Sequence, residues 1–250
     1  MNVKRGIPRL SKEQIDKRAT EFVYSIEKNL PLKPKPVPIE EIIECELQLD
    51  LDYKNIDKDK NTLGLTTFDH GFIEVYNKDC DTLQTIEVIK GTIIIESDLV
   101  DDERLTGRYR FTCAHEVGHW ILHRHLFESD TCLFENSDRD EKNIVRCLNR
   151  NIENIFSYYN SKIKTDYDWL EWQADYFAGA ILLPIIPFTD EFFRLLMKLH
   201  IHQRYLFVDN QRCNIENFKK IIGELSNKFN VSKKAVEVRL AKLNLLRSGN

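Results

Sequence analysis

The chain has 250 residues and a mass of 29.6 kDa, and its 42% hydrophobic content is enough for one large globular domain or two modest ones. Its net charge of −4 and pI near 6.0 argue against a protein built mainly to coat nucleic acid. Because the longest apolar run is too short to span a bilayer and the basic N-terminal segment lacks a signal-like apolar core, we expect a cytoplasmic protein with free thiols and no membrane contact.

The N-terminal segments predict two helices and then a strand. A capping box and an apolar face at helical spacing predict a helix over Ser11–Leu30. Four prolines then favour an extended connector from Pro31 to Pro38, after which a short helix is expected over Ile39–Cys45. Strict alternation of apolar and polar residues over Leu47–Tyr53 is typical of a half-buried strand.

Three further strands are expected before the middle of the chain. Leu63–Phe68 and Phe72–Tyr76 flank Asp69-His70-Gly71, a spacing that indicates a hairpin. The β-branched run Thr92–Glu96 predicts another strand, which could hold a substrate by edge pairing or lie inside the sheet.

Helices are predicted for the rest of the chain. One should start near Thr106 to Arg108 and end about Leu126. The polar stretch that follows, at about 128–168, has apolar residues at helical spacing and indicates a helical insertion. A strong helix over Trp169–Leu183 ends before Pro184. Beyond residue 187 the expected helices are Thr189–His200, Glu216–Phe229 and Ser232–Leu246, and the last two resemble a helix-turn-helix. We therefore expect domains at 1–187 and 188–250.

One pattern carries chemistry. His115, Glu116 and His119 form H-E-x-x-H, and on a helix two imidazoles four residues apart can point at one metal ion. A glutamate beside them can serve as the base for a water at that metal, which is the arrangement that zinc hydrolysis needs. The pattern predicts a Zn²⁺ site with His115 and His119 as ligands and Glu116 as the catalytic base.

Two residues compete for the third ligand position. His125 lies where the metzincin pattern places its third histidine, but that pattern needs a glycine where this chain has Leu122, and on a continuing helix His125 would project away. Glu171 lies on a second helix among core-type residues, with Asp175 one turn later. We favour Glu171 as the metal ligand and Asp175 as the acceptor that fixes a ligand histidine, the alternative being a solvated charged face.

These two motifs resemble the ImmA/IrrE family of metallopeptidases. The resemblance is carried by the segment Arg110–His119 with Leu122-His123, by Glu171–Ala178, by Leu182-Leu183-Pro184 and by the ending around Val231-Ser232, and it covers roughly Ser11 to Arg247. It implies an α+β fold in which a compact zincin-type peptidase domain packs a small mixed sheet against the active-site helices, followed by a helical C-terminal part. The chain departs from the family in a longer gap before Glu171 and in Leu183 at a position that is often Met.

The resemblance also implies a function. Family members typically cut a helix-turn-helix repressor of a phage, a mobile element or a stress regulon, so we expect an endopeptidase acting on such a protein. His123 and Tyr176 are candidates for a substrate or oxyanion contact, as are His202 and Tyr205, and the sequence does not choose between them. The alternative is a non-enzymatic regulator that binds a repressor or DNA through its C-terminal helices, of which Lys233, Lys234, Arg239 and Lys242 are basic.

Overall fold

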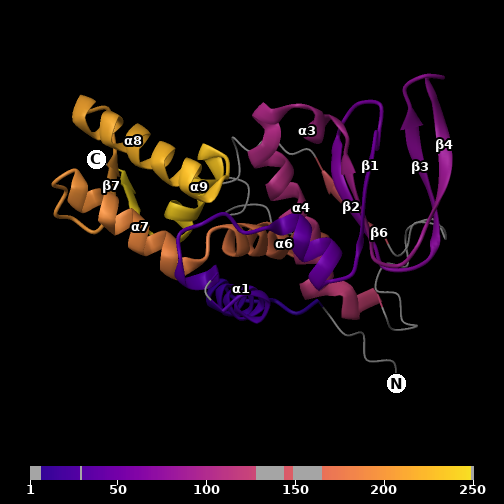
Figure 1. The fold of residues 1–250 in the computed structure, drawn as a ribbon, viewed down its shortest axis with the longest axis horizontal. Helices are drawn as coiled ribbons and strands as arrows, with labels where there is room; N and C mark the ends of the chain where they lie inside the picture. Colours follow the sequence, from indigo (N-terminus) through magenta and orange to yellow (C-terminus); the bar gives the residue numbers. More distant parts are fainter. Residues whose placement is uncertain (1–6, 29, 128–143, 149–164, 249–250) are drawn as a thin grey trace. The chain divides into compact units, whose positions relative to one another are not determined.

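The computed structural model describes residues 7–28, 30–127, 144–148 and 165–248 and has an α+β fold with small sheets and helices (Figure 1). The chain divides into two compact units. The first unit comprises Met1–Lys12 and Pro38–Ala178, and the second comprises Glu13–Val37 and Gly179–Asn250. The helix predicted at the N-terminus therefore groups with the C-terminal helices, and a boundary at residue 187 stays a prediction.

The first unit is built on a four-stranded sheet in the order β1-β5-β2-β6. Its strands are β1 (Asp50–Lys54), β2 (Thr62–Thr67), β5 (Thr92–Glu96) and β6 (Ile144–Leu148). β1 is parallel to β5, whereas β2 is antiparallel to both β5 and β6. Every residue of β2 and β5 is buried, so these two strands form the centre of the unit.

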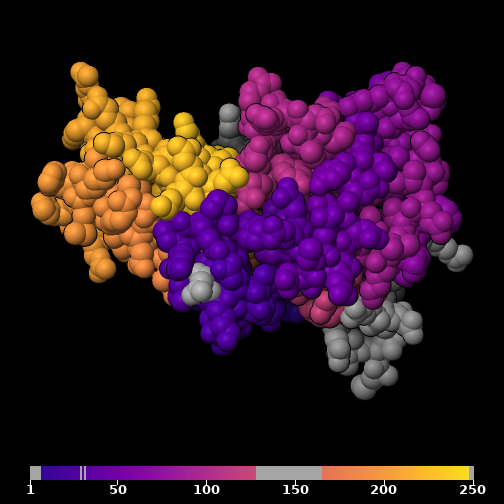
Figure 2. Space-filling model, viewed as in Figure 1, coloured from indigo at the N-terminus to yellow at the C-terminus, as the bar shows by residue number. Residues whose placement is uncertain are grey.

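The prediction that Leu63–Phe68 and Phe72–Tyr76 pair as a hairpin is wrong. β3 (Gly71–Asn77) pairs in antiparallel register with β4 (Thr82–Val88), and the two form a separate two-stranded sheet. Figure 1 shows this hairpin beside the main sheet. In Figure 2 the atoms coloured purple to magenta, which belong to the first unit, form one continuous surface. Both edges of β2 are already taken by β5 and β6, so β2 has no edge left for β3.

The strand at Ile144–Leu148 corrects the prediction of a helical insertion in this part of the chain. Its backbone pairs with β2, Val145 opposite Thr66 and Cys147 opposite Gly64. Two β-branched residues, Ile144 and Val145, begin the segment, and pairing with β2 outweighs the helical spacing of its apolar residues. The predicted helical segments at 128–143 and 149–164 lie outside the described residues. β5 is an interior strand, so of the two alternatives for Thr92–Glu96 the interior one is confirmed.

Helices cover the rest of the first unit. The short α2 (Ile39–Glu41) is followed by a π-helical turn over Ile42–Glu46. Gln48, with a positive φ of 54°, lies between this turn and β1. The remaining helices are α3 (Asp98–Asp101), a 3₁₀ turn over Glu103–Leu105, α4 (Thr106–Phe127) and α6 (Asp166–Leu182), which continues into the second unit. The bounds of α4 agree with the predicted ones.

The second unit is mainly helical. It contains α1 (Lys12–Ile26), a 3₁₀ turn over Leu30–Leu32, α7 (Ile185–Lys198), α8 (Arg212–Phe229) and α9 (Lys233–Lys242), with the short parallel strands β7 (Leu206–Val208) and β8 (Leu246–Ser248). Phe188 and Phe229 are fully buried and meet edge to face. Asn230 ends α8 in the left-handed conformation, and the Ser232 hydroxyl accepts from Ala235 N at the start of α9, as its predicted capping role requires.

Arg239 is buried and does not belong to the basic face that was predicted for the C-terminal helices. Its side chain is 2% exposed, and it donates from Nη2 to Asp16 Oδ1 and from Nε to the Leu183 carbonyl oxygen. It is therefore part of the core of the second unit.

Among the helices in the described ranges, none combines the length and the apolar composition that crossing a membrane requires.

Candidate metal centre

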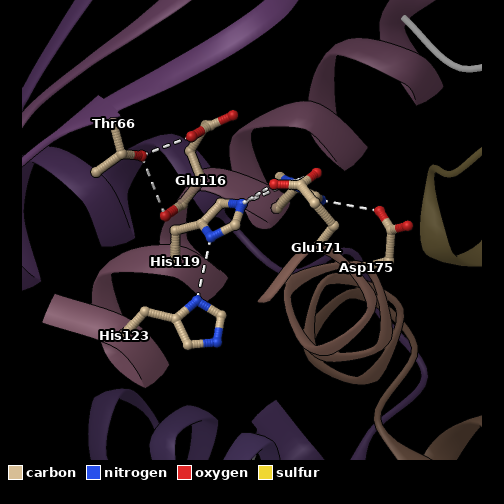
Figure 3. Close-up of polar contacts among 7 residues, drawn as sticks. Thr66, Glu116, His119, His123, Glu171 and Asp175 are labelled. Carbon is tan, nitrogen blue, oxygen red and sulfur yellow. Dashed lines mark hydrogen bonds and ion pairs between the residues drawn. The ribbon is translucent and has the colours of Figure 1, made fainter. Parts of the chain in front are cut away.

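The candidate site lies in the first unit, where α4 packs against α6. Gly118 lies between the two motif histidines, and a Cβ built on it would be 3.1 Å from both the Cα and the carbonyl oxygen of Ala174. The missing side chain lets the two backbones approach closely, as small residues do at tight helix crossings. The approach brings Glu171 and Asp175 of α6 next to His115 and His119 of α4. Figure 3 shows the carboxylate of Glu171 facing His119.

Three buried side chains converge in this region. His115 Nε2 and His119 Nε2 are 2.8 Å apart, Glu171 Oε1 is 3.3 Å from His119 Nε2, and Glu171 Oε2 is 3.6 Å from His115 Nε2. All three side chains are at most 2% exposed. Within the described ranges they are the one group of histidine, cysteine or carboxylate side chains arranged to hold a metal ion. The structure thus brings together the three predicted ligands.

The protonation of these groups suits metal binding. Burial alone would raise the pKa of Glu171, but contacts with His115 and His119 outweigh it and lower the pKa well below its usual range. Burial, together with the neighbouring His115, lowers the pKa of His119. An ionised carboxylate and an imidazole that releases its proton readily are what metal binding requires of these residue types.

Asp175 lies one helical turn after Glu171 and contacts the outer nitrogen of His115, a predicted ligand. Its Oδ1 is 2.9 Å from His115 Nδ1. A carboxylate at this position accepts the Nδ1 hydrogen and leaves the lone pair of Nε2 facing the other two ligand atoms. The geometry agrees with the role predicted for Asp175.

Glu116 is fully buried and lies against β2. Its Oε2 accepts a 2.6 Å hydrogen bond from the Thr66 hydroxyl, whereas its Oε1 has no hydrogen-bond partner among the described residues (Figure 3). A Cβ on Gly64 would be 2.7 Å from Oε1, so the carboxylate fits only because position 64 has no side chain. Burial raises the pKa of Glu116 to about 8, so the carboxyl group holds its proton at neutral pH and is a stronger base than an ordinary carboxylate once ionised.

The residues predicted to contact the substrate or the oxyanion, and the competing ligand His125, differ in burial and in position. His123 is 1% exposed, and its Nδ1 is 3.1 Å from His119 Nδ1. Tyr176 is 1% exposed, with its ring against Trp172. His125, the competing third ligand, is exposed and is not in the converging group. His202 is exposed and Tyr205 half-buried, both in the second unit.

Sequence reasoning missed Gly64 and Thr66. They lie about fifty residues before the motif, in a strand whose composition suggests only core packing, and nothing local marks them as neighbours of Glu116. Their alternation on one face of β2 was the available signal, because residues two apart in a strand point the same way. Using that signal requires knowing which strand lies beside α4.

The donor set fits a divalent metal ion. Two imidazole nitrogens and one carboxylate are a ligand set found in catalytic zinc sites, which leave a fourth position open. If Asp175 takes the His115 Nδ1 hydrogen and His119 also carries its hydrogen on Nδ1, both inward Nε2 atoms and the carboxylate oxygens are acceptors with no hydrogen between them. A cation among them removes the repulsion, so the residues present fit a divalent metal.

Comparison with known proteins adds little to this picture. No protein-family model matches the chain, and no curated protein matches it. Among solved structures, it is similar to a Mycobacterium tuberculosis transcriptional regulator, with a TM-score of 0.42 and 14% identity over 92% of this chain and 46% of the regulator. The chain therefore spans less than half the length of that protein, and a likeness this distant carries no argument about function.

Proposed function

We propose that this chain is a zinc-dependent endopeptidase with a zincin-type first unit. The observation that carries the proposal is the convergence of His115, His119 and Glu171 next to the buried carboxylate of Glu116. Zinc suits this set of two nitrogens and one oxygen better than magnesium or calcium, which prefer oxygen ligands. The resemblance to the ImmA/IrrE metallopeptidases rests on the same residues and supports the same reading.

In this proposal each residue has one task. When bound, Zn²⁺ would supply Lewis acidity, polarising the scissile carbonyl and making a water molecule more acidic. Once ionised, Glu116 accepts the proton of the attacking water at Oε1, which has no hydrogen-bond partner among the described residues, and later delivers it to the leaving amine. Thr66 holds the other oxygen of Glu116, and Asp175 holds the ring of His115. The burial of the site keeps bulk water from competing for these groups.

We further propose that the substrate is a helix-turn-helix repressor of a phage, a mobile element or a stress regulon in the cytoplasm. This assignment rests on the family resemblance alone, since the site chemistry accepts any peptide bond. Substrate choice must therefore come from surfaces outside the metal centre.

One experiment tests the peptidase proposal without a known substrate. The zinc-loaded protein is incubated with peptides from a bacterial proteome, and new N-termini are identified by mass spectrometry. We expect cleavage by the wild type and none by Glu116→Gln, which removes the base with little change in shape. Equal numbers of new N-termini with both proteins would exclude Glu116 as the base, and none with either would exclude a peptidase that accepts unstructured peptides.

One observation favours a second candidate, a regulator that binds nucleic acid. The second unit contains 17 Lys and Arg against 10 Asp and Glu, whereas the first contains 19 against 30. A basic helical unit that ends in a helix pair could bind the DNA backbone. Salt-dependent binding of the full chain to duplex DNA, lost when Lys233 and Lys234 are changed to Glu, would support it, and binding that ignores salt would contradict it.

A further inference from the structure

His119 and His123 contact each other through their outer nitrogens. The two Nδ1 atoms are 3.1 Å apart, and the rings lie on successive turns of α4 with centroids 5.2 Å apart (Figure 3). His123 is 1% exposed, and its Nε2 has no hydrogen-bond partner among the described residues. A buried imidazole nitrogen without a partner costs about 1–3 kcal/mol, so an apolar side chain would be the less costly choice at this position.

The contact is satisfied by two proton arrangements. In one, His119 Nδ1–H donates to His123 Nδ1 and the lone pair of His119 Nε2 faces Glu171. In the other, His123 donates and the hydrogen of His119 lies on Nε2, where it would block a metal ion. Only the first arrangement gives both motif histidines an inward lone pair, because Asp175 already holds His115 in the matching state.

We propose that His123 is a positioning residue that accepts the Nδ1 hydrogen of His119 and thereby holds its Nε2 toward the metal. The inference rests on the proposed metal site and extends it. The two ligand histidines are then held by different partners, a carboxylate for His115 and a neutral imidazole for His119.

This role differs from a substrate or oxyanion contact, for which the sequence made His123 a candidate. The nitrogen nearest the site is engaged with His119, and the side chain is enclosed by protein. His123 should therefore affect how tightly and in which geometry the metal is held. An effect on substrate affinity alone is not expected.

The test measures zinc affinity by competition with a chromophoric chelator, using the full chain. His123→Leu and His123→Phe remove the acceptor, whereas His123→Asn retains one, because the Asn side-chain oxygen lies about where Nδ1 lies in histidine. Loss of such a partner typically weakens metal binding by about 10–100-fold, so we expect that loss for Leu and Phe and affinity close to wild type for Asn. The exposed His125, changed to Leu, is the matched control and should bind zinc normally.

Two further measurements separate positioning from packing. The visible absorption of Co²⁺-loaded protein reports ligand geometry and should change in the Leu and Phe variants and be restored in Asn. The Tm of the metal-free variants should not follow their order of zinc affinity. Wild-type affinity in the Leu variant, or equal losses in Leu and Asn that track metal-free stability, would overturn the inference while leaving the peptidase proposal intact. A wild type that binds no zinc would overturn both, and zinc binding as expected without any cleavage would overturn only the peptidase.

Discussion

Gly64 in β2 lies directly against Glu116 in α4, with room for a hydrogen but not for a methyl group. A Cβ at position 64 would be 2.7 Å from Glu116 Oε1 and 2.8 Å from Thr112 Cγ2. Contacts this short force the neighbours to move. The strand therefore fixes the position of the proposed base from the side opposite the helix.

Changing Gly64 to Ala should damage both stability and activity. We expect a loss of about 1–3 kcal/mol in the free energy of unfolding, as for other overpacked cores. The displaced carboxylate should lower kcat/KM by up to about 100-fold, because small misplacements of catalytic groups are costly. Gly71→Ala is the control, since a Cβ there meets nothing within 4 Å. Urea unfolding and peptide cleavage measure the two effects, and equal behaviour of both variants would contradict the proposed cradle.

Glu171 should be required for metal binding. Glu171→Gln preserves the size of the side chain but removes the charge that balances a dication, so we expect the zinc content after dialysis to fall from about one equivalent to a small fraction of that. Asp166→Asn, an exposed position on the same helix, is the control. Elemental analysis gives the metal content, and zinc retained in full by the Gln variant would place the third ligand elsewhere.

Asp175→Asn tests the carboxylate that contacts His115. The Asn oxygen can still accept the Nδ1 hydrogen, but its neutral charge should make the ring less basic, and losing such a partner typically costs about 10–100-fold in metal affinity. We expect zinc affinity to fall by about 10-fold in Asp175→Asn and by more than that in Asp175→Ala. Chelator competition measures both variants. An Ala variant with wild-type affinity would show that the contact has no part in holding the metal.

The sequence predicted which residues converge at the candidate site better than it predicted the sheet. His115, Glu116 and His119 are local in one helix, and Glu171 with Asp175 share a second, so helical spacing alone defined each half of the site. Strand pairing depends on residues far apart in the chain, and local turn chemistry at residues 69–71 suggested the wrong neighbour for β3. β4, with mostly exposed residues and little apolar alternation, gave no signal to correct it.

Contacts made by single polar side chains were also beyond local reasoning. Arg239 looked like part of a basic helix face, yet it lies in the core because Asp16, more than two hundred residues earlier, accepts its hydrogen bond. Thr66 looked like an ordinary strand residue until α4 was placed beside it. In each case the partner is set by tertiary structure.

Glu96 should make stability depend on pH away from the metal centre. Its side chain is 1% exposed, its Oε2 accepts from Ile56 N, and burial raises its pKa above the ordinary 4.5 despite that hydrogen bond. The folded state then holds its proton more tightly than the unfolded state, so stability falls as pH rises from about 4.5 through the folded pKa.

Glu96→Gln removes this titration and keeps an oxygen for Ile56 N. Compared with wild type, the variant should lose less stability across that pH interval and be relatively more stable above it. Urea unfolding between pH 4 and pH 8, about the range in which a buried carboxyl group titrates, measures the difference. Parallel curves for the two proteins would show that Glu96 does not titrate differently on folding.

The pair Arg239–Asp16 should stabilise the second unit. Arg239 Nη2 and Asp16 Oδ1 are 2.6 Å apart at 2% and 13% side-chain exposure, and Arg239 Nε also donates to the Leu183 carbonyl oxygen. Arg239→Met leaves Asp16 without its cation in a largely buried position, which typically costs about 3 kcal/mol in the free energy of unfolding. Changing Asp16 to Leu in the Met variant should recover part of that loss, because the remaining charge is removed. The exposed pair Arg212–Glu216 is the control, and its removal should cost less than about 1 kcal/mol. If urea unfolding gives the same small loss for both pairs, Arg239 contributes no more than a surface ion pair and α1 is held to the C-terminal helices by apolar packing alone.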